Sequence, residues 1–234
     1  MITKSITSTR QRHRLSRSRE VPLLINTPID VRATATTRAR YQRLAPMYDR
    51  MEALSERQFR AGRQKLWSFV RGPRVLEVGV GTGKNMPFWP RVVEMTAIDL
   101  TPGMLGKAQQ RAAELKIKAD LRLGDVQALE FPDASFDTAV ATFVFCSVPD
   151  PVLGLRELKR VVKPGGQLIL LEHMRSPNAA IGRIMDVLNP VVVRIMGANI
   201  NRRTVENVQA AGWSIEQVED LRMSGIMKII IARS

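Results

Sequence analysis

The chain has 234 residues, 44% of them hydrophobic, and a formal net charge of +14, as expected for one globular domain with a basic appendage. It contains no run near the ~20 apolar residues that a membrane-spanning helix needs. The single cysteine, Cys146, excludes an internal disulfide, and two histidines, His13 and His173, exclude a histidine-rich metal site. We therefore expect an intracellular, cytoplasmic protein that holds no metal ion.

The positive charge is concentrated at the N-terminus. Residues 1–46 hold ten lysines and arginines against two acids, which makes +8 of the total of +14. Residues 1–35 lack a sustained apolar period, so we expect a disordered extension there and a folded domain over residues 36–234. Three roles stay open for the extension: a solvated tail, a contact with anionic lipid or nucleic acid, and, because it is rich in arginine and serine, organelle targeting.

Helical spacing runs from residue 37 to residue 70, interrupted at Pro46. Beyond it the chain alternates short apolar runs with helical patterns. The runs predict strands at residues 75–78, 95–100, 121–123, 136–142, 167–171, 213–218 and 226–232. Thr101-Pro102 and Asp150-Pro151 have the residue types that begin helices, and further helices are expected after Ala179 and over 204–211. This alternation predicts an α/β fold, with a doubly wound, mostly parallel, seven-stranded sheet and a helical N-terminal extension.

The stretch VLEVGVGTGKN, residues 75–85, has an acid, Glu77, near the end of a predicted strand and then places glycine at every second position: Gly79, Gly81 and Gly83. A dinucleotide-binding loop would need its third glycine where Lys84 stands. A P-loop would need serine or threonine where Asn85 stands. The loop therefore favours a ligand that approaches the backbone closely and carries no phosphate.

Further polar residues fall at the carboxyl ends of the predicted strands, where ligands of such sheets bind. Asp99 lies near the end of the second strand and is placed to accept hydrogen bonds from both hydroxyls of a ribose. Asp125 follows the third and is placed to accept from the amino group of an adenine. Thr142, Phe143, Glu172 and His173 lie at the ends of the fourth and fifth strands. A ligand with a ribose, an adenine and no phosphate fits S-adenosylmethionine.

Four stretches in this order, VLEVGVGTG, AIDLTPGMLGKAQQRA, GDVQALEFPDASFDTAVATFVF and LRELKRVVKPGGQLILLEH, resemble the class I S-adenosylmethionine-dependent methyltransferases over about residues 40–234. The resemblance implies a Rossmann-like methyltransferase fold, with S-adenosyl-L-methionine as cofactor and S-adenosyl-L-homocysteine as product. It also implies that an N-terminal aromatic residue, here Tyr48, closes the cofactor site. The implied cofactor-binding residues are Tyr48, Glu77, Gly79, Gly81, Gly83, Asn85, Asp99, Leu100, Met104, Asp125, Val126, Thr142 and Phe143.

Methyl transfer requires mainly alignment of the reactants and exclusion of water, with a general base only for a protonated acceptor. His173 is the candidate base, and a purely structural histidine is the alternative. Cys146 stands among Phe143, Val144, Phe145 and Val148, so we expect a small core residue rather than a nucleophile. Tyr41 is expected to pack within a helix.

A segment near residues 175–205 falls where such enzymes carry a substrate cover, and it is rich in Ile, Met, Val and Leu with interspersed arginines. It is interpreted as a helix packed on the sheet, as the wall of an apolar acceptor site with a basic mouth, or as a face that rests on an anionic membrane. The wider pattern resembles quinone-biosynthesis C-methyltransferases, phosphatidylethanolamine N-methyltransferases and membrane-associated thiol methyltransferases. An apolar or lipid-like small-molecule acceptor is therefore expected.

Two other functions stay open at this point: an RNA-binding protein or RNA-directed methyltransferase that uses the basic extension, and a cofactor binder without catalysis. Nucleic acid is not the expected partner, because no aromatic-rich RNA-binding module and no N-x-P-Y or D-x-P-Y tetrapeptide accompanies the charge. The sequence leaves the oligomeric state open.

Overall fold

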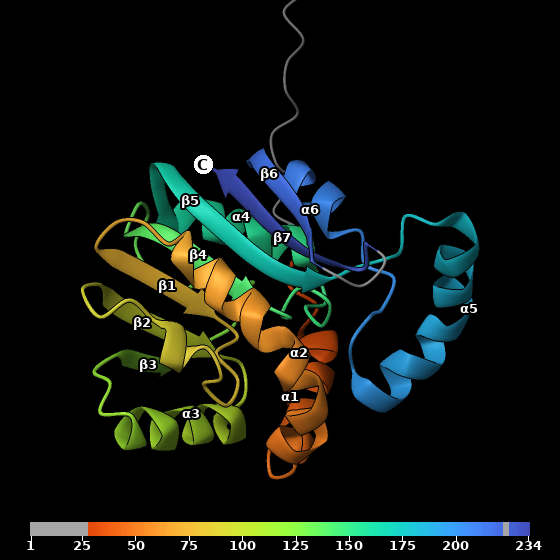
Figure 1. Ribbon diagram of the computed structural model, residues 1–234, viewed down its shortest axis with the longest axis horizontal. Helices are drawn as coiled ribbons and strands as arrows, with labels where there is room; N and C mark the ends of the chain where they lie inside the picture. Colours follow the sequence, from red (N-terminus) through yellow and green to blue (C-terminus); the bar gives the residue numbers. More distant parts are fainter. Residues whose placement is uncertain (1–27, 222–224) are drawn as a thin grey trace, which may run out of the picture.

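The computed structural model describes residues 28–221 and 225–234, which form one seven-stranded sheet between two layers of helices (Figure 1). The strand order is β3-β2-β1-β4-β5-β7-β6. The first five strands in this order are parallel, and β7 runs antiparallel to both of its neighbours. The strands are β1 (Arg74–Val78), β2 (Glu94–Asp99), β3 (Asp120–Leu123), β4 (Phe136–Thr142), β5 (Val162–His173), β6 (Ser214–Leu221) and β7 (Met227–Arg233). The expected doubly wound α/β fold is confirmed.

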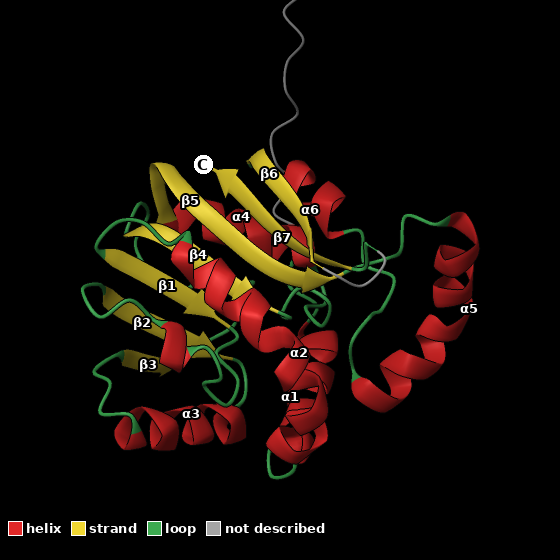
Figure 2. Cartoon of the chain, in the orientation of Figure 1, coloured by secondary structure: helices red, strands yellow, loops and turns green. Residues whose placement is uncertain are grey.

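The helices cover both faces of the sheet (Figure 2). They are α1 (Val31–Leu44), α2 (Tyr48–Ser68), the 3-10 turn η1 (Met86–Phe88), α3 (Pro102–Glu114), α4 (Pro151–Val161), α5 (Ala179–Met196) and α6 (Thr204–Ala210). As expected, the chain breaks its first helical segment at Pro46, since proline lacks the N–H that a helix interior requires. The carboxylate of Asp150 caps α4 by accepting from the backbone N–H of Leu153 at 2.9 Å.

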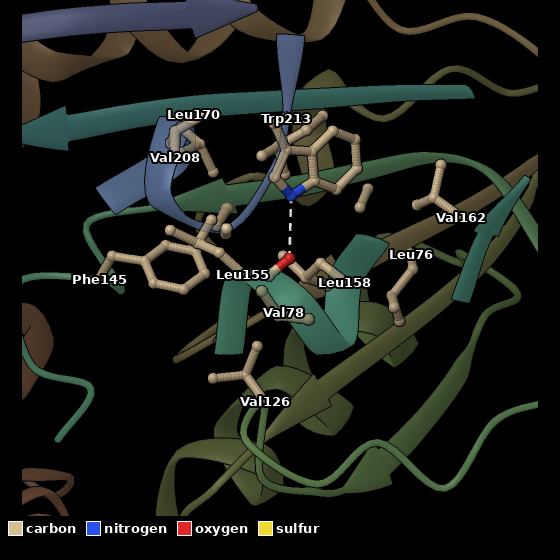
Figure 3. Packing of buried hydrophobic residues seen from close by; sticks show 14 of the residues in the cluster. Leu76, Val78, Val126, Phe145, Leu155, Leu158, Val162, Leu170, Val208 and Trp213 are labelled. Carbon is tan, nitrogen blue, oxygen red and sulfur yellow. Dashed lines mark hydrogen bonds between the residues drawn. The ribbon is translucent and has the colours of Figure 1, made fainter. Parts of the chain in front are cut away.

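Strand β5 shows how the sheet is buried from both sides. Leu168 and Leu170 belong to a core cluster with α4 and α6, whereas Ile169 and Leu171 pack in a second cluster with α2 and α3. This division follows from the two-residue period of a strand. In the first cluster the indole Nε1 of Trp213 donates to the backbone oxygen of Leu155 at 2.9 Å and so ties α4 to the start of β6 (Figure 3).

Helix α1 begins at Val31, inside the segment that the sequence assigned to a disordered extension. Its first turn is capped by Asp30, whose carboxylate accepts from the backbone N–H groups of Arg32 and Ala33 at 3.0 and 2.9 Å. The amide of Gln127 also donates to the hydroxyl of Thr34 at 3.1 Å. The expected extension is therefore too long by several residues, and the rest of that prediction, residues 1–27, lies outside the described residues.

Two truncations test this boundary. A chain that lacks residues 1–27 is expected to melt at the wild-type temperature, because the sequence of this segment has no sustained apolar period that would pack against a core. A chain that lacks residues 1–35 loses the Asp30 cap and the Thr34 bond, so its melting temperature should fall by about 2–4 °C or more, for a cap worth about 1 kcal/mol. Calorimetric melting of both chains measures the difference. Equal melting temperatures would show that the first turn of α1 adds no stability.

Helix α5 is the exception to the layered arrangement, because it lies beyond the end of β5 and apart from both helical layers (Figure 1). Met185 is its one buried large apolar side chain among those described. In the described part of the chain, no helix is long and apolar enough to cross a bilayer.

Candidate functional site

A cavity lies at the carboxyl ends of β1, β2 and β4, beneath α1 and the start of α2. This is the edge where the sequence placed the polar residues, and where parallel strands present their ligand-binding loops. Ten of the predicted site residues line it: Tyr48, Gly79, Gly81, Asp99, Leu100, Met104, Asp125, Val126, Thr142 and Phe143. Four do not line it: Glu77, Gly83, Asn85 and His173.

Glycine stands at three positions of the loop after β1, and the physical reason differs between them. A Cβ on Gly81 would point into open space, with its nearest neighbour, the oxygen of Gly79, 4.0 Å away. On Gly79 it would lie 2.5 Å from Val144 Cγ2, and on Gly83 2.9 Å from the side chain of Met86. All three glycines, Gly79, Gly81 and Gly83, also have a positive φ, of +64°, +58° and +80°, which favours glycine. The space above Gly81 is therefore where a ligand can approach the backbone, while Gly83 serves the packing of the loop.

Asp99 joins two loops as well as lining the cavity. Its Oδ2 accepts from the backbone N–H of Gly81 and its Oδ1 from that of Thr101, both at 2.8 Å. Burial raises the pKa of this carboxyl, and the two backbone donors act against that rise. Each carboxylate oxygen has a second lone pair. Asp99 therefore holds the glycine loop at the cavity wall, and its hydrogen bonds to the hydroxyls of a ligand stay a prediction.

Asp125 shapes the next part of the wall. Its Oδ1 accepts from the backbone N–H of Gln127 at 2.9 Å, which fixes the turn after β3. Gln127 also lines the cavity, and its bond to Thr34 fastens α1 over the site. Val126 is buried between them, with a relative exposure of 7%.

Two tyrosines close the cavity from the helical side. The hydroxyls of Tyr41 and Ser147 lie 2.5 Å apart, and the rings of Tyr41 and Tyr48 are 6.4 Å apart between centroids. Burial raises the pKa of both phenols, so both hydroxyls stay protonated near neutral pH. The expectation that Tyr41 only packs within a helix is wrong, because it lines the cavity. Its spacing of seven residues from Tyr48 was a signal for this, and Pro46 obscured it.

Glu77 and Asn85 form a buried network behind the glycine loop. Glu77 accepts from the side-chain nitrogens of Asn85 and Trp89 at 2.6 and 2.7 Å. Asn85 in turn accepts from Arg63 Nη1 at 2.9 Å and donates to Thr142 Oγ1 at 3.0 Å. Burial raises the pKa of Glu77 to about 7. These contacts brace the loop from the protein side, and a direct contact of either residue with a cofactor stays a prediction.

Phe143 has a backbone φ of +58°, unusual for a residue with a side chain and worth about 1–3 kcal/mol of strain. Glu172 Oε1 holds the loop after it by accepting from the N–H groups of Val144 and Phe145 at 2.8 and 3.0 Å. The ring of Phe143 is held by Phe59, 4.9 Å away between centroids. Strain of this kind is characteristic of functional sites, and here it turns the loop that carries Ser147 towards the cavity.

The structure bears on the prediction for Cys146, a small core residue, but not on that for His173, a general base. Cys146 is buried, and burial raises the pKa of its thiol to about 12, so it is a core residue as expected. His173 ends β5 opposite Met227 of β7 and is partly buried, which lowers its pKa and favours the neutral ring. Its role as a general base stays a prediction. Among the described residues, no group of three or more metal-ligating side chains comes together.

A family model described as "Methyltransferase domain" matches residues 76–170. The chain is 38% identical over 121 residues to a phosphatidylethanolamine N-methyltransferase of Cereibacter sphaeroides, covering 50% of this chain and 60% of that protein. It is 32% identical over 150 residues to a thiol S-methyltransferase of Rattus norvegicus, covering 62% of each. It is 31% identical over 169 residues to a demethylmenaquinone methyltransferase of Deinococcus radiodurans, covering 68% of each. The matches to the first two relatives therefore span about three fifths of their lengths.

Among solved structures, an S-adenosylmethionine-dependent methyltransferase of Thermotoga maritima has a TM-score of 0.65 and 20% sequence identity, covering 83% of this chain and 98% of that one. At this identity the likeness concerns the fold alone. It confirms the Rossmann-like methyltransferase architecture that the four sequence stretches implied.

Proposed function

Because the chain belongs to the class I S-adenosylmethionine-dependent methyltransferases, we propose that it transfers the methyl group of this cofactor to an apolar or lipid-like small molecule. The observation that carries the proposal is the set of acceptors in the names of its relatives: a phosphatidylethanolamine, a thiol and a demethylmenaquinone. Accordingly, the proposed acceptor is a quinone precursor, a phospholipid of the phosphatidylethanolamine type or an alkyl thiol. The same relatives give the RNA-directed alternative no support.

S-adenosylmethionine is the cofactor of this family, and the residues of the cavity fit it. Gly81 leaves space for close approach to the backbone, and Asp99 has free lone pairs for the ribose hydroxyls. Leu100, Met104 and Val126 provide apolar walls that suit an adenine ring. The bound cofactor supplies a methyl group that its positive sulfonium already activates.

The chain's own contribution is orientation and the exclusion of water. Helix α1 is fastened over the cavity at three points along its length. Thr34 accepts from Gln127, Tyr41 bonds Ser147, and Gln42 Oε1 accepts from the backbone N–H of Gly103 at 2.9 Å. These bonds hold Tyr41 over the cavity and keep bulk water from this side of it.

A comparison of acceptors tests the proposal. Labelled methyl transfer is measured from S-adenosylmethionine into phosphatidylethanolamine vesicles, an alkyl thiol, a demethylated quinone and bulk RNA, with Gly81→Val as the inactive control. We expect transfer to at least one of the three apolar acceptors and none to RNA. Faster transfer to RNA would contradict the proposal. Binding of the cofactor without transfer to any acceptor would identify a non-catalytic binder instead.

A further inference from the structure

Helix α5 carries a continuous exposed apolar surface. Six of the fourteen exposed large apolar side chains in the described chain lie on this one helix. We call them the α5 apolar stripe: Ile181, Ile184, Val187, Leu188, Val191 and Ile195, with relative exposures of 39%, 58%, 72%, 49%, 56% and 69%. Most of them follow one another at intervals of three or four residues, so they share one side of the helix. None of these six side chains belongs to either hydrophobic core cluster of the protein.

The opposite side of α5 is anchored by its neighbours in the chain through polar contacts. Asp186 accepts from Arg175 Nη2 at 2.8 Å and from Asn201 Nδ2 at 3.1 Å. Asn189 donates to Asn199 Oδ1 at 3.1 Å and accepts from the backbone N–H of Ile200 at 2.9 Å. These bonds fix the rotation of the helix with the stripe turned outward. The interpretation of this segment as a helix packed on the sheet is therefore wrong, and the stripe does not line the cofactor cavity.

Positive charge borders the stripe. Arg183, Val187, Val191 and Arg194 follow at steps of four, four and three, so the two exposed arginines stand at the ends of one row along its edge. Among the described residues, no carboxylate lies within 4.0 Å of either arginine. The only acid on the helix, Asp186, is engaged with Arg175 on the other side.

We propose that the α5 apolar stripe, with Arg183 and Arg194 at its edge, docks on the surface of an anionic phospholipid bilayer. Aliphatic side chains would enter the boundary between head groups and acyl chains, and the guanidinium groups would reach the phosphates. Charge argues against a second copy as the occupant. Antiparallel pairing of two α5 helices about a twofold axis would bring Arg183 of one copy near Arg194 of the other, with no acid on that face to compensate.

The position of α5 gives this docking a consequence for the enzyme. The segment just after α5 is bonded to the cavity wall, since Asn199 N donates to the oxygen of Cys146 at 2.9 Å and Arg202 Nη2 to that of Val148 at 2.7 Å. Val148 itself lines the cavity. A bilayer in contact with the stripe would lie beside the site. Docking of the stripe on a bilayer does not depend on which acceptor the enzyme uses, since binding to vesicles is measured without methyl transfer.

A vesicle-binding experiment tests the contribution of the apolar side chains of the stripe. The full chain is sedimented with vesicles of phosphatidylcholine alone and of phosphatidylcholine mixed with phosphatidylglycerol. We expect binding to the anionic vesicles, and a loss of about tenfold or more in partition for the double variant Val187→Glu, Val191→Glu. Val92→Glu is the matched control, because Val92 is 92% exposed and precedes β2, which lies three strands away from β5 in the sheet. It should bind as the wild type does.

A second pair of variants keeps the test decisive if the glutamates disturb the helix. Arg183→Gln and Arg194→Gln remove exposed charges that make no described ion pair, and each should weaken binding to anionic vesicles about fivefold. Arg91→Gln, on the same loop as Val92, is the control and should change nothing.

Three results would overturn the proposal. The first is that both sets of α5 variants bind anionic vesicles as the wild type does, while a variant of the N-terminal segment loses this binding. In that variant, five arginines are replaced by glutamine: Arg10, Arg12, Arg14, Arg17 and Arg19. The second is a full chain that binds neither kind of vesicle. The third is a dimer in sedimentation velocity that the stripe variants convert to monomer while vesicle binding stays unchanged. Transfer to the alkyl thiol and the demethylated quinone, measured separately without vesicles, distinguishes failure of this proposal from failure of the proposed function.

Discussion

Replacing Gly81 with valine is expected to weaken binding of S-adenosylmethionine by at least about 100-fold, or about 3 kcal/mol. The new side chain would occupy the open space above the loop, since a Cβ there has no neighbour closer than 4.0 Å. It would also strain the backbone at a φ of +58° and disturb the N–H that donates to Asp99. Calorimetric titration of the variant with S-adenosylmethionine measures the loss.

Gly165→Val is the matched control for this experiment. Gly165 also has a positive φ, +73°, and a Cβ on it would meet nothing within 4 Å, but it lies in β5 away from the cavity. Both variants therefore impose similar backbone strain, and we expect a similar fall in melting temperature. Only Gly81→Val should lose the cofactor. If it retains wild-type affinity, the space above Gly81 is not the cofactor site.

The second large effect is expected from Glu172→Gln and depends on pH. Burial raises the pKa of Glu172 from its usual 4.5 to about 7, because water cannot solvate its charge. A carboxyl whose pKa is raised in the folded state contributes stability below pH 4.5, and that contribution is lost as pH rises through about 7. Glutamine stays neutral and keeps one oxygen for the N–H groups of Val144 and Phe145. Relative to the wild type, the variant should therefore gain about 3 kcal/mol of unfolding free energy across this range.

Urea unfolding of both proteins at a series of pH values measures this difference. Glu157→Gln is the control of opposite sign, because hydrogen bonds from Arg160 lower the pKa of Glu157. Its carboxylate contributes stability above its usual pKa and loses it as pH falls, so this variant should be less stable than the wild type at neutral pH. If the Glu172→Gln and wild-type curves stay parallel over the whole range, Glu172 titrates as an exposed carboxyl does, and its burial plays no part.

Much of the fold could be predicted from the sequence because its signals act over a few residues. Strand β4 has the predicted bounds, and α3 and α4 begin at the proline of their predicted start signals. β5 is the larger discrepancy, since it starts at Val162 and not at residue 167. Val162 pairs with Phe136 of β4 across a register shift, and a partner strand of this kind leaves no mark in the local apolar pattern.

The candidate site, like the fold, could be predicted from the sequence only in part. By itself the sequence determined the edge of the sheet where the site lies, because the glycine loop, Asp99 and Asp125 lie at or just after the carboxyl ends of strands, and these ends must meet there. It was also sufficient for the cofactor, because each of the four family stretches can be recognised from its own consecutive residues. Only the tertiary structure placed Tyr41 over the cavity, through its bond with Ser147, 106 positions away. It likewise turned Glu77 inward to Asn85 and Trp89 and left the α5 apolar stripe exposed. Such outcomes depend on which side chains meet after the chain has folded, because an apolar or acidic residue has the same local pattern whether it faces a ligand, the core or water.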